Sequence, residues 1–454
     1  MANEDYSTQS PLTQQSVELL QTMIRNKCVN DGTIESGHES RNADTLISFL
    51  QGRGLVIDRH EPVPDRASVV ARIEGSDPTA PSLCLMGHTD VVPVTESSWT
   101  HDPFGGELID GEIWGRGAVD MLNLTSAMAV AFRHLADTGF KPKGDLLFFG
   151  VADEEADCGA GASWFAENDP DAIRADYVIT ENGGLHLGTP EAPQVMMHVG
   201  EKGIEWRRLT VRGTPGHGSR PFKADNALIK AAGVVQRLAE YRPAPRFHEL
   251  WRQQVDGFGF DEETTAALLD EGSIDAFLDD LDLPSVAGHL HACTHTTFSP
   301  NVIHPPEMQK ANVIPDAISI EVDIRTLPGE TPEDVDEHLR LALGDLYEHV
   351  EFETFSQYPS TISRADTPLW DSLQHAVSRP FPGAKISPHL IVGFTDSRIY
   401  REMGAVAYGA GLFSPQLDVM SFGDRFHGND ERIDIESMAL STQFFIDVAK
   451  DFLT

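Results

Sequence analysis

Cysteine, lysine and long apolar runs are all scarce in this chain of 454 residues. Its four cysteines are scattered without Cys-x-x-Cys spacing, which favours a reduced, cytoplasmic protein over a secreted one held by disulfides. No apolar run approaches the ~18 residues that a membrane-spanning helix needs. The amino terminus, Met-Ala-Asn-Glu-Asp-Tyr-Ser, lacks a basic segment followed by an apolar one, so we expect no export signal.

Basic residues are also few. Nine lysines and 25 arginines stand against 71 acidic residues, and the formal net charge is −37. This charge argues strongly against nucleic acid or an anionic membrane as a partner. It also implies self-repulsion that high salt would screen, and an acidic, lysine-poor surface suits the cytoplasm of a salt-loving organism. We therefore predict a halophilic, cytoplasmic protein.

Two short apolar runs, 83–86 and 145–152, predict buried strands of a covered sheet. Ligand chemistry in open α/β sheets collects at the carboxyl ends of such strands. Histidine or acidic residues follow these two runs and a third predicted strand at 177–180, and others lie in two loops. They are His88, Asp90, Asp120, Glu154, Glu155, Glu181 and His427. A histidine among several carboxylates is a ligand set for a divalent metal of intermediate hardness, zinc above all.

Together these residues could build a two-metal site. Asp90, two residues after His88, is placed to fix the imidazole ring from behind. Asp120 has two oxygens and so can bridge two ions. Glu154 and Glu155 are adjacent, and an extended backbone would point them in opposite directions. One can then bind metal while the other acts as a general base on the bound water.

The order of predicted elements indicates an α/β protein with a second domain inserted in its middle. Short continuous apolar strands alternate with helices in the first and last parts of the chain, which favours a mostly parallel central sheet. In the middle, 204–211 and 317–326 alternate apolar and polar residues, as antiparallel strands with one wet face do. We predict a catalytic domain of residues 1–202 and 361–454, interrupted by an α+β lid domain at 203–360.

Other segments carry predictions from local pattern alone. The turn-rich stretch after His88 predicts a loop, 433–453 predicts one long closing helix, and 256–282, with ten acidic residues, predicts a solvated helical insertion. In a fourth segment every second residue is a histidine or a cysteine: His289, His291, Cys293 and His295. A strand would place all four on one face, which would be either the wet face of a lid strand or a third metal site.

Several motifs together resemble the zinc aminopeptidase-like family, which includes carboxypeptidase G, aminoacylase, acetylornithine deacetylase and succinyl-diaminopimelate desuccinylase. In chain order they are Gly-His-Thr-Asp-Val-Val-Pro, Asp-Pro-Phe-Gly-Gly, Gly-Arg-Gly-Ala-Val-Asp, Asp-Glu-Glu and His-Gly-Asn-Asp-Glu. The resemblance implies two Zn²⁺ per subunit, with Co²⁺ or Mn²⁺ as possible substitutes. Its implied roles are a bridging Asp120, one ion on His88 and Glu181, the other on Glu155 and His427, Glu154 as general base, and Asp90 orienting the histidine.

The predicted lid resembles the family's dimerisation domain. In Gly-Thr-Pro-Gly-His-Gly-Ser, His217 matches a histidine that reaches a substrate carbonyl across a homodimer. Asn312 and Arg325 resemble contacts of the substrate carboxylate. Residues 393–398, Gly-Phe-Thr-Asp-Ser-Arg, resemble a Gly-Gly-Thr-Asp-x-Arg loop of the same pocket. The matching positions of this loop are Gly393, Thr395 and Arg398.

Two departures from the family pattern are visible. Met121-Leu122-Asn123 replaces the frequent Met-Lys-Gly after the bridging aspartate, and residues 245–300 lengthen the lid. The resemblance still predicts hydrolysis of an amide whose nitrogen belongs to an amino acid with a free carboxylate. Carboxypeptidase or dipeptidase, N-acyl amino acid deacylase, and acetylornithine- or succinyl-diaminopimelate-type deacylase remain open. An inactive relative that serves as a binding protein is disfavoured, because Glu154 and every expected ligand are present.

Overall fold

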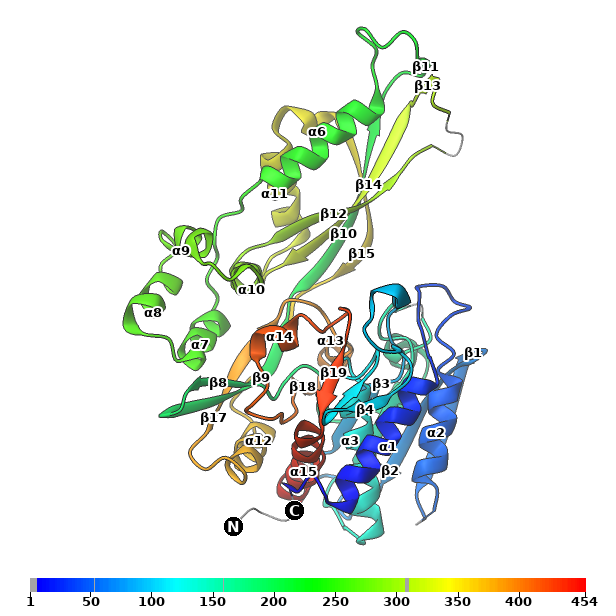
Figure 1. Ribbon diagram of the computed structural model, residues 1–454, viewed down its shortest axis with the longest axis vertical. Coiled ribbons are helices and arrows are strands. Elements are labelled where there is room, and N and C mark those ends of the chain that lie inside the picture. Colours follow the sequence, from blue (N-terminus) through cyan, green and yellow to red (C-terminus); the bar gives the residue numbers. More distant parts are fainter. Residues whose placement is uncertain (1–5, 53, 158, 307–309) are drawn as a thin grey trace.

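The computed structural model describes residues 6–52, 54–157, 159–306 and 310–454, which form a broad lower unit and a narrower upper one (Figure 1). Residues 1–5, on which the export-signal prediction mainly depends, and Cys158 lie outside the described residues. Across the described ranges, no helix combines the length and apolar character needed to cross a membrane.

The lower unit is built around a ten-stranded sheet. In sheet order its strands are β1 (Val56–Val63), β2 (Arg66–Ile73), β6 (Leu146–Val151), β3 (Leu83–His88), β7 (Tyr177–Thr180), β18 (Val406–Gly409), β9 (Ala192–Glu201) and β16 (Thr361–Ile362), with β17 (Lys385–Ile391) and β8 (His186–Thr189) also paired to β9. The four central strands β6, β3, β7 and β18 are parallel, whereas β1, β2, β8 and β16 pair antiparallel. The predicted α/β class is confirmed, with a sheet that is parallel at its centre and mixed as a whole.

Helices cover both faces of this sheet. On one face lie α1 (Pro11–Arg25), α2 (Ser40–Leu50), α3 (Leu122–Asp137), α12 (Pro368–Ser378) and α15 (Ile435–Phe452), and on the other α4 (Ala162–Asn168), α5 (Pro170–Ile173) and α13 (Ser397–Glu402). Successive side chains of β3 point to opposite faces of the sheet. Leu83 and Leu85 pack in the core beneath the first group of helices, and Cys84 and Met86 pack in the core beneath the second group. Burial on both sides is why this strand reads as a continuous apolar run.

A small three-stranded sheet beside the large one was not predicted. Its strands, in sheet order, are β19 (Arg432–Asp434), β5 (Glu112–Trp114) and β4 (Glu107–Ile109). The stretch after His88 is therefore partly a hairpin, preceded by the 3-10 turn η2 (Glu96–Ser98), and the closing helix begins only at Ile435 because β19 occupies the residues before it. This sheet brings the segment before β19, with the short helix α14 (Val419–Gly423), beside the loop after β5.

The upper unit has its own sheet and core. Its antiparallel strands, in order, are β12 (Thr297–His304), β14 (Ala317–Thr326), β10 (Gly203–Arg212) and β15 (Val350–Tyr358), with α6 (Ala227–Glu240), α11 (Pro332–Leu343) and η3 (Gly344–His349) against one face. The short pair β11 (Gly216–His217) and β13 (Val313–Ile314) forms its tip (Figure 1). The chain enters after Glu201 and returns at Thr361, and on this change of sheet we propose the boundaries 202/203 and 360/361.

The segment that lengthens the lid consists of helices α7 (Glu249–Phe258), α8 (Glu262–Leu268), α9 (Ile274–Asp280) and α10 (Pro284–Thr294). It is helical, as predicted, but not simply solvated, since Trp251, Leu268 and Ile274 are buried in a core of its own. Helix α7 packs on β17 of the lower unit. Lys202, at the crossing between the units, donates to the carbonyls of Ala292 (2.9 Å) and His295 (2.7 Å) beside α10.

The predicted strand at 289–295 is wrong, because these residues belong to α10 and its C-cap. Helical geometry pairs residues four apart: His289 Nε2 lies 3.7 Å from Cys293 Sγ, and the rings of His291 and His295 stack with centroids 4.0 Å apart. The four side chains therefore do not share one face as a strand would arrange them. Neither group of possible metal ligands in the described part of the chain includes them.

Candidate metal centre

The predicted ligands meet at the carboxyl edge of the central sheet. His88 ends β3, Glu181 directly follows β7, and the turn with Glu154 and Glu155 follows β6. Because these three strands are adjacent and parallel, their carboxyl ends converge. Two loops complete the cluster: Asp120 arrives just before α3, and His427 arrives from the segment before β19.

Asp120 lies between the two histidines. Its Oδ1 is 3.2 Å from His88 Nε2 and its Oδ2 is 3.2 Å from His427 Nε2. His427 Nε2 is also 3.1 Å from Glu155 Oε2, while His88 Nε2 is 4.0 Å from the nearer carboxylate oxygens of Glu154 and Glu181. One carboxylate with each oxygen directed at a different imidazole is the arrangement that a bridging ligand needs.

The cluster concentrates acidic groups in a buried place. Burial raises the pKa of the Glu154 and Glu181 carboxyls well above their usual range, and it raises that of Glu155 to about 7. Contacts with the carboxylates of Asp120 and Glu155 raise the pKa of His427 to about 10. Positive charge therefore stabilises the ionised form of this cluster.

The donor set fits divalent metal ions. Ligand atoms within 4.8 Å of one another come from His88, Asp120 and Glu155 in one group and from His88, Glu154 and Glu181 in another. Glu155 Oε1 is buried and has no hydrogen-bond partner within the described residues. Imidazole nitrogen with carboxylate oxygen suits zinc. Glu154 and Glu181 lie equally close to His88, each with an oxygen 4.0 Å from Nε2.

Asp90 holds both the histidine and the glutamate turn. His88 Nδ1 lies 3.0 Å from the backbone carbonyl of Asp90 and 3.6 Å from its Oδ1. The Asp90 carboxylate accepts from the backbone N–H groups of Glu154 (3.3 Å) and Glu155 (3.1 Å). The extended backbone expected at Glu154 and Glu155 is wrong, because they lie in a turn and the preceding Asp153 has φ 66°.

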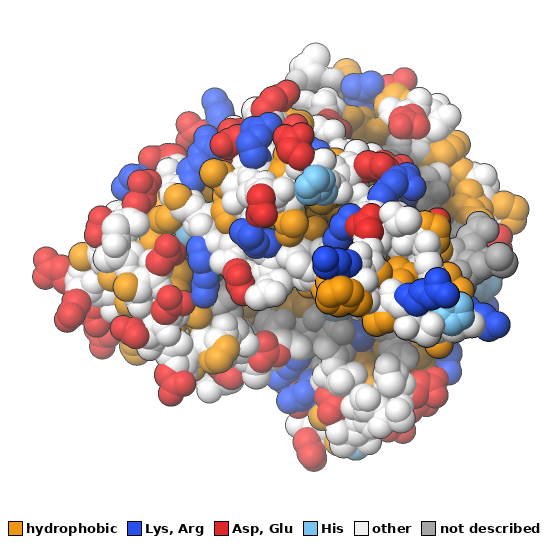
Figure 2. Space-filling model, turned by 90° about the horizontal axis from the view of Figure 1, so that it is seen from above, with side chains coloured by type: hydrophobic (Ala, Val, Ile, Leu, Met, Phe, Trp, Pro, Cys, Tyr) orange, Lys and Arg blue, Asp and Glu red, His pale blue; other side chains and the backbone are white. Residues whose placement is uncertain are grey.

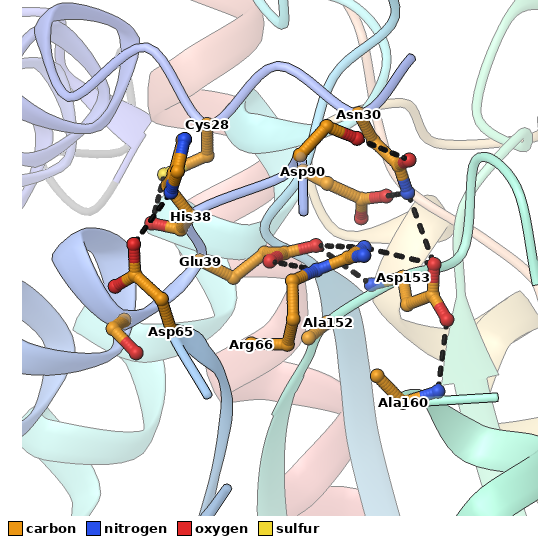
Figure 3. A network of polar contacts seen from close by, with 12 residues as sticks. Cys28, Asn30, His38, Glu39, Asp65, Arg66, Asp90, Ala152, Asp153 and Ala160 are labelled. Carbon is orange, nitrogen blue, oxygen red and sulfur yellow. Dashed lines mark hydrogen bonds and ion pairs between the residues drawn. The ribbon is translucent and has the colours of Figure 1, made fainter. Parts of the chain in front are cut away.

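A buried network that the sequence analysis missed supports this turn (Figure 3). Arg66, only 1% exposed, donates to both oxygens of Glu39 (2.6 and 2.7 Å) and to Asp153 Oδ1 (2.8 Å). The Asn30 amide bridges Asp90 Oδ2 (2.9 Å) and Asp153 Oδ1 (3.1 Å). An arginine at the start of a mostly apolar strand, β2, was the one sequence signal for this network.

Glu431 lies in a motif that the sequence analysis recognised without giving this residue a role. It links the segment that contains Asp120 to the segment that contains His427. It is fully buried, and its Oε2 accepts from Arg116 Nη1 at 2.8 Å. The other arm of Arg116 donates to the backbone carbonyl of His427 at 3.2 Å. Glu431 also accepts from the N–H groups of Gly117 (3.0 Å), Val119 (2.6 Å) and Asp120 (2.9 Å).

The segment that contains Gly393, Thr395 and Arg398 lies where the two units meet. Arg398 pairs with Asp157 (2.8 Å) and lies 3.9 Å from the ring centroid of Tyr358. Arg325, from β14 of the upper unit, pairs with Asp323 (2.7 Å). The ring of Phe394 lies within 5.4 Å of the Arg325 guanidinium and 5.1 Å of that of Arg398. Two predicted substrate arginines thus approach one phenylalanine.

His217 and Asn312 are placed elsewhere. The backbone N–H of Gly218 donates to the carbonyl of Asn312 (2.7 Å), so these two predicted residues are neighbours. Both are exposed and belong to the tip of the upper unit, at the end away from the lower unit (Figure 1). The structure therefore does not bring them to the metal centre of their own chain.

Comparison with known proteins agrees with this architecture. Probable carboxypeptidase S-like 2 of Dictyostelium discoideum is 27% identical over 403 residues, covering 85% of this chain and 74% of the relative. N-fatty-acyl-amino acid synthase/hydrolase PM20D1 of Homo sapiens is 28% identical over 409 residues, covering 87% and 78%. The crystal structure of the M20 family metallo-carboxypeptidase Sso-CP2 from Sulfolobus solfataricus has the same fold, with a TM-score of 0.70, 18% identity, and coverage of 98% of this chain and 99% of that one.

A family model described as peptidase family M20/M25/M40 matches residues 84–451, a range that includes every candidate ligand from His88 to His427. The predicted resemblance is thereby confirmed, and the family and its named relatives indicate a hydrolase. This chain belongs to peptidase family M20/M25/M40.

Proposed function

We propose that this protein is a two-metal hydrolase that cleaves an amide bond to an amino acid with a free carboxylate. The observation that carries the proposal is Asp120, which directs one oxygen to His88 and the other to His427, together with a buried oxygen of Glu155 that has no hydrogen-bond partner among the described residues. A carboxylate cluster arranged in this way is suited to divalent metal ions. Family membership supports metal-dependent amide hydrolysis in general.

In this proposal His88 and Glu181 would hold one Zn²⁺ ion, Glu155 and His427 would hold the other, and Asp120 would serve both. Co²⁺ or Mn²⁺ would be possible substitutes. Bound there, the ions would supply Lewis-acid chemistry, which polarises a carbonyl and acidifies water.

Glu154 is the proposed general base. Its backbone N–H donates to the Asp90 carboxylate, and its own Oε2 lies 4.0 Å from His88 Nε2, so its carboxyl group reaches the centre. It takes the proton of the attacking water and returns it to the leaving nitrogen. Asp90 acts through its neighbours, because it contacts the His88 ring and holds the turn that contains Glu154 and Glu155.

Recognition of the free carboxylate is assigned to Arg325 and Arg398, with Gly393 and Thr395 lining the same pocket, whereas Asn312, at the tip of the upper unit, would contribute only across a dimer. Arg325 Nη1 and Arg398 Nε are buried and lack a hydrogen-bond partner within the described residues, so each arginine keeps a donor for a substrate. Guanidinium groups suit carboxylates because they donate two parallel bonds. Asp323 pairs with Arg325 and Asp157 pairs with Arg398, so each arginine already has one carboxylate partner.

The position of His217 supports a homodimer in which its tip reaches the partner's centre. Ser219 donates its backbone N–H to His217 Nδ1 (3.2 Å), so the neutral ring has its proton on Nε2, ready to donate to a carbonyl oxygen. The edge strand β12 and helix α6 expose Ile303 (54%) and Ile229 (70%). Figure 2, seen from above, shows apolar side chains among charged ones at the upper end of the molecule. Exposed apolar residues on an edge strand and a helix suit a self-complementary interface.

The test is a hydrolysis screen of N-acyl amino acids and dipeptides in molar salt, with zinc, cobalt or manganese added to chelator-treated protein. We expect turnover only with metal, and only for substrates with a free carboxylate. Matched amidated substrates are the control. Preference for acetylornithine or succinyl-diaminopimelate would favour the deacylase alternative. Tight substrate binding without turnover in any metal would favour an inactive binding protein and refute the proposal.

A further inference from the structure

We infer that Glu201 is the positioning residue of the substrate loop, residues 393–398, and that only a carboxylate can serve there. The inference rests on the proposed function, because that function assigns the loop to substrate binding. Glu201 is 1% exposed and ends β9, the last strand before the chain crosses into the upper unit. It was not among the residues that the sequence analysis selected.

One oxygen of Glu201 holds the loop. Oε2 accepts from the backbone N–H of Thr395 (2.6 Å) and from its hydroxyl (3.2 Å). The same hydroxyl accepts from the N–H of Ser397 (3.1 Å), which begins α13. The conformation of the loop between Gly393 and Arg398 therefore depends on one carboxylate oxygen.

The other oxygen holds the return crossing. Oε1 accepts from Arg401 Nη1 (2.6 Å) and from the hydroxyl of Thr361 (2.9 Å), where the chain re-enters the large sheet. The backbone carbonyl of Glu201 accepts from the Ser360 hydroxyl (2.5 Å). Both connections between the units and the substrate loop thus meet at Glu201.

The partners explain why a carboxylate is needed. The Thr395 N–H and the Arg401 guanidinium can only donate, and they lie at opposite oxygens. A glutamine has one accepting oxygen and one donating amide group. Its oxygen would turn to the charged guanidinium, because that bond is stronger. Its amide would then face the N–H of Thr395, and the loop would lose its anchor.

The loop also joins the two arginines proposed for the substrate carboxylate. Phe394 lies between Arg325 of the upper unit and Arg398 of the lower unit. A shift of the loop would therefore disturb both guanidinium groups while leaving the metal ligands in place. We expect loss of Glu201 to weaken substrate binding more than the chemical step.

The experiment compares Glu201→Gln, Arg401→Met and the double variant, with Thr361→Val as a control that removes only the hydroxyl at the return crossing. For Glu201→Gln we expect unchanged zinc content and a KM about tenfold higher, the loss of one hydrogen bond to a charged group, with kcat nearly unchanged. Arg401→Met should lower the melting temperature but keep KM near wild type. In the double variant the glutamine oxygen is free to turn back to Thr395, so KM should recover although stability remains low.

Hydrogen exchange of the Thr395 amide gives a second readout that does not depend on activity. It should speed up in Glu201→Gln and slow again in the double variant. Exchange and KM unchanged in Glu201→Gln, or KM values that follow melting temperature across all the variants, would overturn the inference. If the wild-type protein hydrolyses no amide, the proposed function fails, and the exchange pattern still decides the role of Glu201.

Discussion

Replacement of Glu431 by glutamine should weaken the support of Asp120, the proposed bridging ligand. Glu431 Oε2 accepts from Arg116 and Gly117, while Oε1 accepts from the N–H groups of Val119 and Asp120. All four partners donate, so a glutamine amide must face two of them. Its oxygen should stay with the guanidinium, which leaves the N–H groups of Val119 and Asp120 opposed by another donor.

The expected loss of stability follows from the number of N–H groups left without an acceptor. Two buried N–H groups without an acceptor cost about 1–3 kcal/mol each, so unfolding should become easier by about 2–6 kcal/mol. One of the two belongs to Asp120, the proposed bridge between both ions. Loss of support behind a ligand typically weakens metal binding about 10- to 100-fold. We expect a zinc affinity reduced by that factor.

The assay is competitive zinc titration with a chromogenic chelator, beside thermal melts of apo and loaded protein. Glu436→Gln is the matched control, because that exposed carboxylate accepts only from the Ser414 hydroxyl (2.6 Å) among the described contacts. It should leave both quantities near wild type. A Glu431→Gln protein with wild-type zinc affinity and melting temperature would refute the reasoning.

Four further predictions address the base, the surface, the dimer and the core. Glu154→Gln should retain metal but lose at least ~10²-fold in kcat, since an amide cannot accept the water's proton; near-normal rates with full metal content would remove Glu154 from this role. The melting temperature should rise steeply from low to molar KCl, because the net charge is −37, and a flat curve would contradict the halophilic prediction. Co-expressed His217→Ala and Glu154→Gln subunits should recover roughly a quarter of wild-type activity, since mixed dimers make up half of random pairs and each has one complete site; verified heterodimers without activity would place His217 in its own subunit or outside the reaction. Burial lowers the pKa of His198 to about 3, so the folded state binds fewer protons than the unfolded one, and stability should fall as the pH drops from about 6.5 toward 3; His198→Phe should flatten that dependence in acid melts.

The sequence was sufficient for those features that repeat locally or occur as a dense motif. Continuous apolar runs indicated β3, β6 and β7, because strands buried on both faces need apolar residues at every position. Alternation indicated β10 and β14 of the upper unit. The motif order led to the family, which the match over residues 84–451 confirms.

Local pattern was misleading where more than one structure satisfies it. The alternating histidines before Thr296 belong to a helix, since a spacing of two says nothing of the contacts four residues apart that a helix provides. The paired glutamates were expected on an extended backbone, but they lie in a turn that follows a left-handed Asp153. The turn-rich loop concealed β4 and β5, strands too short for periodicity to reveal.

The sequence by itself determined the fold class and the chemical types gathered at the strand ends. Only the tertiary structure decided which polar residues support them. Glu201 looks like an ordinary surface residue in the sequence, where most charged side chains are solvated, and neither the place of Arg66 in β2 nor the motif around Glu431 reveals their partners. Each is buried against several donors or acceptors that come from distant parts of the chain. A buried charge is stable only with such partners, and no local pattern records them.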